Sequence, residues 1–304
     1  MAKLCLGTVQ FGMNYGVYNQ IGRQPTWDES FSMLDYALEN GIDTIDTARA
    51  YGEAELVLGE YFKNRKDKKN NVKAISKLRP NVIDEGADIE KVVKEECKNT
   101  LQRLNLEKLD GYLLHTPEYI YNDEILLALR TLKKEGYVDN IGVSIYDLKE
   151  GTAAIETGVV DYIQLPYSIL DQRGSKSGFF HKAKETGITV FTRSAFLQGL
   201  FMMEENSVPR QLYDAIGYIK IFDDVRKKYG LSKSEALIKF VEYEKDIDYL
   251  VFGVEKKEQL IEDINVYNKS IDAKDFVDEI KEKIDNVDKS IIFPSLWSNG
   301  KKAE

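Results

Sequence analysis

The sequence predicts a single α/β domain, a (β/α)8 TIM barrel, and two patterns support this fold class. Short apolar runs rich in β-forming residues alternate with amphipathic stretches of about ten to fifteen residues, which is typical of repeated strand–helix units and a parallel sheet. No Gly-x-Gly-x-x-Gly motif opens a helix after the first strand, so an open doubly wound sheet is disfavoured. Barrels of this class run to about 250 residues or more as one unit, and we therefore assign residues 1–304 to one barrel.

Eight strands are predicted, each followed by a loop and a helical pattern, at residues 4–6, 44–46, 72–76, 111–114, 140–143, 162–164, 189–191 and 249–252. Helices with apolar residues at helical spacing are predicted at 30–39, 90–103, 125–135 and 234–242. Gly41, Gly136 and Gly187 each lie just beyond the last turn of a helical pattern, where a glycine ends a helix. Eight such units favour closure of the sheet into a barrel.

Composition limits the partners and the location. The net charge is −9 and lysines are interspersed with glutamates, so no positive surface is expected for nucleic acid. No signal peptide and no run of about 20 apolar residues is found, so we expect no membrane partner and a cytoplasmic location. Cys5 and Cys97 are expected to be reduced thiols, and two histidines are too few for a histidine-rich metal site, so no metal is expected.

Three segments fall outside the regular repeat. Residues 197–235 are expected to form an insertion over one barrel face, with an irregular piece at 202–211. The stretch 272–289 is predicted as a solvated helix, and His181 as a residue on a helix surface. The tail at 290–304 contains an apolar segment, 293–297, that either covers the barrel mouth or packs on another face.

Four titratable residues follow consecutive strands at their carboxyl ends, where barrels place functional groups. Asp46 ends the second strand, Tyr51 follows in the next loop, Lys77 ends the third strand and His115 ends the fourth. Neighbouring strands lie about 4.8 Å apart, so these side chains can meet in one small volume. Each residue alone also has a purely structural explanation, as a helix cap, a turn or a solvated lysine, but their combination indicates a site.

The chemistry of this set suits the reduction of a carbonyl group. The carbonyl oxygen needs a group that polarises it and delivers a proton. A tyrosine is a poor acid at neutral pH, but an adjacent ammonium stabilises its anion, and Lys77 is placed to supply that charge. Asp46 is expected to pair with Lys77, and His115 to donate a hydrogen bond to the carbonyl oxygen.

Residues 41–52, together with Glu55 and Gly59, resemble the first signature of the aldo-keto reductase superfamily. The resemblance extends over nearly the whole chain, through segments 7–8, 11–12, 113–115, 142–144, 164–168 and 253–254. It implies that Asp46, Tyr51, Lys77 and His115 are a catalytic tetrad in which Tyr51 is the general acid. All four residue types match the family's pattern.

The resemblance also assigns a nicotinamide cofactor, bound without a Rossmann motif. Ser144 and Gln164 match positions that hold the nicotinamide carboxamide, and the loop after the last strand matches the segment that binds the adenosine phosphate end. The cofactor residues expected by this comparison are Ser144, Gln164, Arg193, Ser194, Gly253, Val254, Lys256, Gln259 and Asp263. Lys256 matches the basic residue that holds a 2′-phosphate, so NADPH is expected over NADH, although Glu255 brings an opposing charge.

Two positions depart from the family's pattern. Ile145 replaces an asparagine, which removes one polar contact to the carboxamide. Arg193 replaces a tyrosine that stacks on the nicotinamide; a guanidinium in its place could stack, bind an anionic substrate or bind the cofactor's phosphates.

The expected function is therefore an NAD(P)H-dependent reduction of a small-molecule carbonyl compound. The segment 7–16 resembles a branch associated with bacterial sugar and surface-polysaccharide metabolism, which indicates a keto sugar and makes Tyr15 a candidate substrate residue. Two alternatives remain open. One is a cofactor-binding regulatory subunit with little turnover, and the other is a barrel lyase that forms a Schiff base on Lys77.

Overall fold

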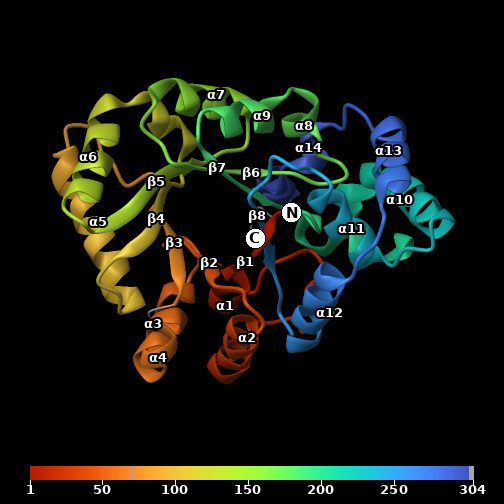
Figure 1. Ribbon diagram of the computed structural model, residues 1–304, viewed down its shortest axis with the longest axis horizontal. Helices are drawn as coiled ribbons and strands as arrows, with labels where there is room; N and C mark the ends of the chain where they lie inside the picture. Colours follow the sequence, from red (N-terminus) through yellow and green to blue (C-terminus); the bar gives the residue numbers. More distant parts are fainter. Residues whose placement is uncertain (70, 301–304) are drawn as a thin grey trace.

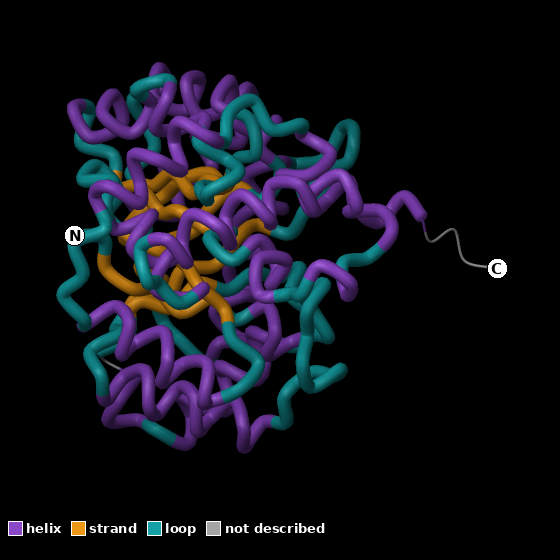
Figure 2. Tube along the Cα trace, turned by 90° about the vertical axis from the view of Figure 1, so that its right-hand side faces the viewer, coloured by secondary structure: helices purple, strands orange, loops and turns teal. Residues whose placement is uncertain are grey.

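The computed structural model describes residues 1–69 and 71–300, and it contains a closed eight-stranded parallel barrel in which each strand pairs with the next and β1 pairs with β8. The strands are β1 (Lys3–Gly7), β2 (Thr44–Asp46), β3 (Lys73–Leu78), β4 (Leu109–Leu114), β5 (Val138–Ser144), β6 (Tyr162–Pro166), β7 (Thr189–Arg193) and β8 (Tyr249–Gly253). The barrel lies inside a layer of helices (Figures 1 and 2). The predicted single-domain (β/α)8 fold is confirmed.

Four of the helices, α2, α5, α6 and α11, were predicted from the sequence, and each begins and ends within about three residues of its predicted bounds. The bounds of all the helices in the described residues follow. They are α1 (Val9–Gly12), α2 (Trp27–Glu39), α3 (Ala54–Asn64), α4 (Lys66–Lys69), α5 (Ile89–Leu104), α6 (Asp123–Lys134), α7 (Leu148–Thr157), α8 (Arg173–Lys176), α9 (Phe179–Glu185), α10 (Ile216–Lys228), α11 (Lys233–Glu242), α12 (Lys257–Asn268), α13 (Lys274–Lys283) and α14 (Lys289–Ile292). Thr26 and Ser232 start α2 and α11 with capping boxes. Gly41, Gly136 and Gly187 have positive φ angles of 84°, 81° and 79°, as expected for residues that end helices.

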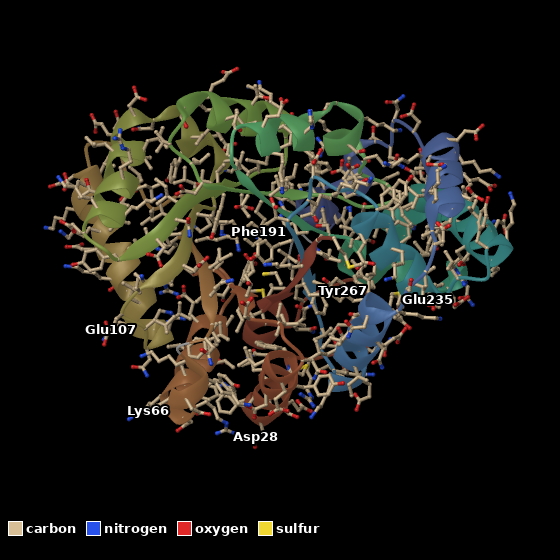
Figure 3. The ribbon with its side chains drawn as sticks, in the orientation of Figure 1. Asp28, Lys66, Glu107, Phe191, Glu235 and Tyr267 are labelled. Atoms are coloured by element: carbon tan, nitrogen blue, oxygen red, sulfur yellow. The ribbon has the colours of Figure 1, made fainter. Side chains whose placement is uncertain are left out.

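The barrel interior is filled by a small apolar cluster that is separate from the core between the strands and the helices. Its members are Cys5, Ile75, Leu113, Phe191 and Val251, with Tyr162 and Tyr249 packed against them. The rings of Phe191 and Tyr249 stack with centroids 4.5 Å apart, and Figure 3 shows Phe191 in the middle of the molecule, whereas Asp28, Lys66 and Glu107 lie at its edge. The barrel is therefore a packed core, and any cavity must lie beyond the strand ends.

The insertion after β7 consists of three short 3-10 helices followed by α10. These short helices are η2 (Leu197–Met202), η3 (Glu205–Ser207) and η4 (Arg210–Ala215), and a further one, η1 (Pro117–Tyr121), follows β4. His181 is exposed on α9, as predicted. The predicted solvated helix at 272–289 is shorter and only half solvated, because α13 buries Phe276, Val277 and Ile280 and packs against α10.

The tail packs beside the carboxyl end of β5. It comprises α14 and η5 (Pro294–Gly300), and the indole nitrogen of Trp297 donates hydrogen bonds to the carbonyls of Ser290 and Ile291 at 3.0 and 3.1 Å. The ring of Phe293 meets that of Tyr146 edge-on at 5.4 Å. Residues 301–304 of the predicted tail lie outside the described residues. None of the helices in the described part of the chain has the length and apolar character that crossing a membrane requires.

Candidate active site

Strand alternation places the candidate residues one layer above the apolar cluster. Ile75 of β3 and Leu113 of β4 belong to that cluster, and alternate residues of a strand face the same side. Lys77 and His115 lie two residues farther along, so they point into the same interior nearer the strand ends. Lys77 is the next-to-last residue of β3 and His115 follows β4 directly, whereas Asp46 ends β2 as predicted.

Asp46 and Lys77 form a buried ion pair. The Lys77 Nζ lies 2.7 Å from Asp46 Oδ1 and also donates to the carbonyl of Thr47 at 2.9 Å, and the two side chains are 0% and 4% exposed. The amide of Gln164 donates to the same Oδ1 at 2.7 Å. Burial lowers the pKa of Lys77, and the charge of Asp46 opposes that shift. The pairing expected from the sequence is thus present, with Gln164 as an additional partner.

Tyr51 and His115 lie at the cavity side of this pair. The Lys77 Nζ is 5.0 Å from the centre of the Tyr51 ring, and the rings of Tyr51 and His115 meet edge-on at 5.8 Å. Burial raises the pKa of Tyr51, and the charge of Asp46 raises it further. We expected Lys77 to make Tyr51 more acidic, but the ammonium donates to Asp46 and Thr47, so burial and the carboxylate dominate.

His115 is a neutral imidazole in this environment. Burial, followed by the charges of Lys77 and Arg193, lowers its pKa to about 3. Its Nδ1 is buried and has no hydrogen-bond partner among the described residues. At neutral pH His115 can therefore donate one hydrogen bond to a ligand through its single N–H group. It lacks the second proton of an imidazolium, so it is not a general acid.

Two glycines that the sequence did not single out as functional hold the Tyr51 loop in place. A Cβ atom on Gly12 would lie 1.8 Å from the Tyr51 carbonyl oxygen and 2.4 Å from the Ala54 nitrogen. Gly52 has a φ of +55°, and a Cβ there would lie 2.3 Å from the Gly12 oxygen. The two backbones therefore touch where no side chain fits. Buried Glu55 anchors the next turn by accepting from Ser76 Oγ and Arg103 Nε.

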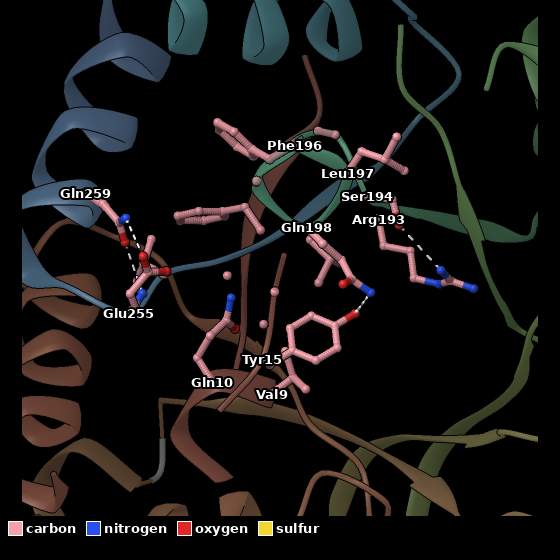
Figure 4. Close-up of a pocket in the computed structure, with 18 of the residues that line it drawn as sticks. Val9, Gln10, Tyr15, Arg193, Ser194, Phe196, Leu197, Gln198, Glu255 and Gln259 are labelled. Atoms are coloured by element: carbon pink, nitrogen blue, oxygen red, sulfur yellow. Dashed lines mark hydrogen bonds between the residues drawn. The ribbon is translucent and has the colours of Figure 1, made fainter. Parts of the chain in front are cut away.

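A cavity of about 710 Å³ opens above these residues and extends to the first turn of α12 (Figure 4). Of the residues predicted for the site, those that line it are Tyr15, Asp46, Tyr51, His115, Ser144, Arg193, Ser194, Gly253, Val254, Lys256, Gln259 and Asp263. Lys77 and Gln164 are not among them. Both polar ends of Gln164 are used within the protein, since its Oε1 accepts from Ser144 Oγ at 3.3 Å. Gln164 therefore positions Asp46 and Ser144 in this structure.

The far end of the cavity is closed by contacts between the loops after β1 and β8. Glu255 Oε1 accepts from the Gln20 backbone at 3.1 Å and from Gln259 Nε2 at 2.9 Å, and Lys256 Nζ donates to Gln20 Oε1 at 2.9 Å. Glu258 also lines this end. Burial, followed by the charge of Glu262, raises the pKa of Asp263. This end is predominantly acidic, because Glu258 and Glu262 add to the opposing charge of Glu255 that the sequence already indicated.

The loop after β7 has a strained backbone along the cavity. Ser194, Leu197 and Gln198 have φ angles of 69°, 46° and 55°, although none is a glycine, and all three line the cavity. Such conformations cost about 1–3 kcal/mol each and tend to cluster where a ligand binds. The sequence carries no signal for them.

The residues at this site suit a nicotinamide dinucleotide. A dinucleotide needs an elongated cavity with polar groups along its length, and two buried atoms that lack a partner in the described part of the chain, His115 Nδ1 and Gln10 Oε1, belong to residues that line it. Gly253 contributes no side chain to the cavity wall, and a Cβ atom there would lie only 2.5 Å from Gln10 Oε1. Ser144 and the loop from Gly253 to Asp263 are the groups placed to hold the two ends.

The structure is a closed (β/α)8 barrel in which Asp46, Tyr51 and His115 line one cavity at the strand ends, with Lys77 buried behind Asp46. These features define a class of barrel enzymes that work at the carboxyl face of the sheet. The sequence matches the model of the Aldo/keto reductase family over residues 3–285, and the chain belongs to this family. Its members are oxidoreductases that act on carbonyl groups with a nicotinamide cofactor, so the resemblance found in the sequence is confirmed.

Two relatives agree with this assignment, and one solved structure agrees with the fold. An aldo-keto reductase of Strobilurus tenacellus, str7, is 30% identical over 220 residues, which cover 67% of this chain and 64% of the relative. An NADH-specific methylglyoxal reductase of Escherichia coli is 29% identical over 232 residues, which cover 66% of this chain and 69% of the relative. The holo form of the aldo-keto reductase AKR11C1 from Bacillus halodurans has a similar fold, with a TM-score of 0.76, 20% identity and 95% coverage of both chains.

Proposed function

We propose that the protein is an NAD(P)H-dependent reductase of aldehydes or ketones in which Tyr51 gives its proton to the carbonyl oxygen. The observation that carries the proposal is the meeting of Tyr51, His115 and the buried Asp46–Lys77 pair at one end of an elongated cavity. The bound cofactor supplies the hydride.

The protonation states of the site suit Tyr51 as the acid in a reduction. The raised pKa of Tyr51 keeps its hydroxyl protonated at neutral pH. The alkoxide that forms when a carbonyl is reduced is a strong base, and the Tyr51 hydroxyl is the group proposed to protonate it. Neutral His115 donates a hydrogen bond that polarises the carbonyl, and it does not compete as the proton source. We therefore assign the proton transfer to Tyr51.

A Schiff base on Lys77 is a poorer account of the same residues. The lysine side chain is 0% exposed, its ammonium is bonded to Asp46 and Thr47, and it does not line the cavity. A carbonyl substrate in the cavity meets Tyr51 and His115 first. These contacts support a role for Lys77 in holding Asp46 and the Tyr51 loop.

The choice of cofactor follows from the charges at the far end of the cavity. Lys256 favours NADPH, as expected from the sequence, but its ammonium is bonded to Gln20. Glu255, Glu258 and Glu262 all line the cavity with Lys256, and carboxylates repel a 2′-phosphate, whereas they accept hydrogen bonds from a free ribose hydroxyl. We therefore propose NADH as the preferred cofactor and NADPH as the weaker one. The Escherichia coli relative is likewise named for NADH.

The proposed substrate is a small carbonyl compound, with a keto sugar as the candidate from the sequence, and the proposed location is the cytoplasm. Tyr15 supports a substrate role because it lines the cavity and its hydroxyl accepts a hydrogen bond from Gln198 Nε2 at 3.0 Å. Burial, followed by the charge of Tyr51, raises the pKa of Tyr15 to about 12. Its hydroxyl therefore remains a hydrogen-bond donor at neutral pH.

Replacement of Tyr51 by phenylalanine tests the proposal. Loss of the proton donor is expected to lower kcat by about 10²- to 10⁴-fold, while the affinity for NADH, measured by fluorescence titration, stays unchanged. Tyr121→Phe, which removes a hydroxyl from an exposed tyrosine, is the matched control and is expected to keep the full rate. A Tyr51→Phe enzyme that kept more than a tenth of the rate would show that another group delivers the proton.

A further inference from the structure

Arg193 presents a cation to the cavity without a matching anion. It is the last residue of β7 and lines the cavity, its guanidinium carbon lies 4.3 Å from the centre of the Tyr146 ring, and its Nη2 donates to the Ile145 carbonyl at 3.1 Å. In the described part of the chain no carboxylate forms an ion pair with it. Arg173 is also stacked on an aromatic ring, but it is paired with Asp171 at 2.8 Å. A partly buried cation usually has such a partner.

The guanidinium lines the same cavity as Tyr51 and His115 and points away from the far end of that cavity. Figure 4 shows the Arg193 side chain extending away from Glu255 and Gln259. After burial and the charge of Lys77, Arg193 is the remaining cause that lowers the pKa of His115, and it also opposes the rise in the pKa of Tyr51. Its charge is therefore felt by the groups that hold the carbonyl.

One of the three uses expected for Arg193 fits this placement poorly. Contact with the adenosine phosphate end would require the side chain to turn toward α12, opposite to its observed direction. One face of the guanidinium lies on Tyr146, so a nicotinamide can stack only on the opposite face, and such stacking leaves the N–H donors at the edge of the guanidinium free. Binding of an anionic group of the substrate needs only unused N–H donors at the edge of the guanidinium. Two of its five donors have partners in the described part of the chain, the Ile145 carbonyl and the more distant Ser194 Oγ at 3.4 Å.

Tyr15 lines the same cavity and offers a second hydrogen-bond donor (Figure 4). Its hydroxyl oxygen accepts from Gln198, and its own proton has no acceptor among residues 1–69 and 71–300. The charge of Arg193 acts on Tyr15 as well, although burial has the larger effect on its pKa. An oxyanion near Arg193 can therefore accept from both side chains.

We propose that Arg193 and Tyr15 form an oxyanion subsite beside Tyr51 and His115, and that the natural substrate is an aldehyde or ketone carrying a carboxylate or phosphate group. The inference rests on the proposed reductase function and names its substrate class. A guanidinium edge binds such groups with two parallel hydrogen bonds, which fixes the orientation of the carbonyl as well as adding affinity.

Substrate pairs that differ in charge test the subsite. The pairs are benzaldehyde with 4-carboxybenzaldehyde and glyceraldehyde with glyceraldehyde 3-phosphate. The pair with the larger difference in kcat/KM shows whether the subsite prefers a carboxylate or a phosphate. In the wild type kcat/KM should be higher for the charged member of a pair. Arg193→Met should lower that value by about 10- to 100-fold and lower the value for the neutral member by a clearly smaller factor. Arg193→Lys should restore part of the loss, because it keeps the charge without the planar fork.

Arg79→Met is the matched control. Arg79 follows β3 at the same end of the barrel, is half exposed and pairs with Glu96, and it does not line the cavity. This variant should leave all four kcat/KM values unchanged.

A binding measurement separates the subsite from the reductase function. Calorimetric titration with 4-(hydroxymethyl)benzoate and benzyl alcohol, in the presence of NADH and in its absence, should show tighter binding of the carboxylate, and Arg193→Met should remove the difference. Equal binding of the two alcohols, together with equal reduction of charged and neutral aldehydes, overturns the subsite and leaves the reductase function standing. If the carboxylate binds in an Arg193-dependent way but no aldehyde is reduced, the subsite stands and the reductase function is overturned.

Discussion

Asp46 Oδ1 accepts two hydrogen bonds of 2.7 Å, from Lys77 Nζ and from Gln164 Nε2, in a layer of the barrel that solvent barely reaches. The Asp46–Lys77 contact joins β2 to β3, and the contact with Gln164 reaches β6 across the barrel. One carboxylate thus ties three strands together at the floor of the cavity.

Removal of this carboxylate should leave a buried ammonium without a partner. We expect Asp46→Ala to lower the free energy of unfolding by about 3–5 kcal/mol, measured by urea denaturation at pH 7. Asp43→Ala removes an exposed pair with Lys73 at 3.1 Å and should cost less than about 1 kcal/mol. The double variant Asp46→Asn/Lys77→Met should regain most of the loss, and equal destabilisation by both aspartate variants would contradict the assignment.

The contact between Gly12 and the Tyr51 loop predicts a variant that damages catalysis from outside the cavity. Gly12→Ala must push the loop away, because its Cβ would lie 1.8 Å from the Tyr51 carbonyl oxygen. We expect kcat to fall by at least about tenfold, since small misplacements of a reacting group are costly, together with a lower Tm. Gly217→Ala is the control: it lies in α10 with open space around it and should keep kcat and gain up to about 1 kcal/mol of stability.

His115 makes the stability of the fold depend on pH in a defined direction. Its pKa is about 3 in the folded protein and about 6.5 in an unfolded chain, so the unfolded state binds a proton first as the pH falls. This contribution to stability is present at pH 7 and declines below about pH 6.5, by about 2.5 kcal/mol at pH 4.5. His115→Gln should remove this part of the decline in chemical denaturation at the two pH values. The exposed His181 provides the control, and an identical pH dependence for His115→Gln and His181→Gln would refute the effect.

The acidic far end of the cavity predicts how cofactor preference can be changed. The wild type should have a lower KM for NADH than for NADPH. Glu255→Lys should shift the ratio of the two KM values toward NADPH by at least about tenfold, because it replaces a repelling charge by an attracting one. Lys256→Glu should shift the ratio further toward NADH. A wild type that prefers NADPH, with a preference that Lys256→Glu abolishes, would restore the interpretation drawn from the sequence.

The sequence was sufficient for the fold and for the groups at the cavity floor, because both depend on local periodicity. Strand alternation alone puts Lys77 and His115 on the inner side of β3 and β4, and their order along the chain follows the order of the strands around the barrel. The strand ends were placed within a few residues.

Features that depend on contacts between distant segments could not be predicted from local periodicity. Gln164 is predicted as a cofactor residue, and the sequence gives no sign of its hydrogen bond to Asp46, which is 118 positions away. The left-handed backbone at Ser194, Leu197 and Gln198 has no sequence signal, since none of these residues favours it. The orientation of Arg193, which separates its three possible uses, depends on the Tyr146 ring and the Ile145 carbonyl and thus on how β5 and β7 lie in the closed barrel.

The contacts that run from Phe293 through Tyr146 to Arg193 affect how substitutions in this protein combine. Phe293 rests on Tyr146, and Tyr146 supports the guanidinium of Arg193, so a residue close to the end of the chain buttresses a group at the cavity wall that it does not touch. Substitutions at Phe293 and Arg193 are therefore coupled, and their effects should not be additive. Among homologues, a change of substrate preference could then arise by exchange of the tail alone, with every cavity-lining residue conserved.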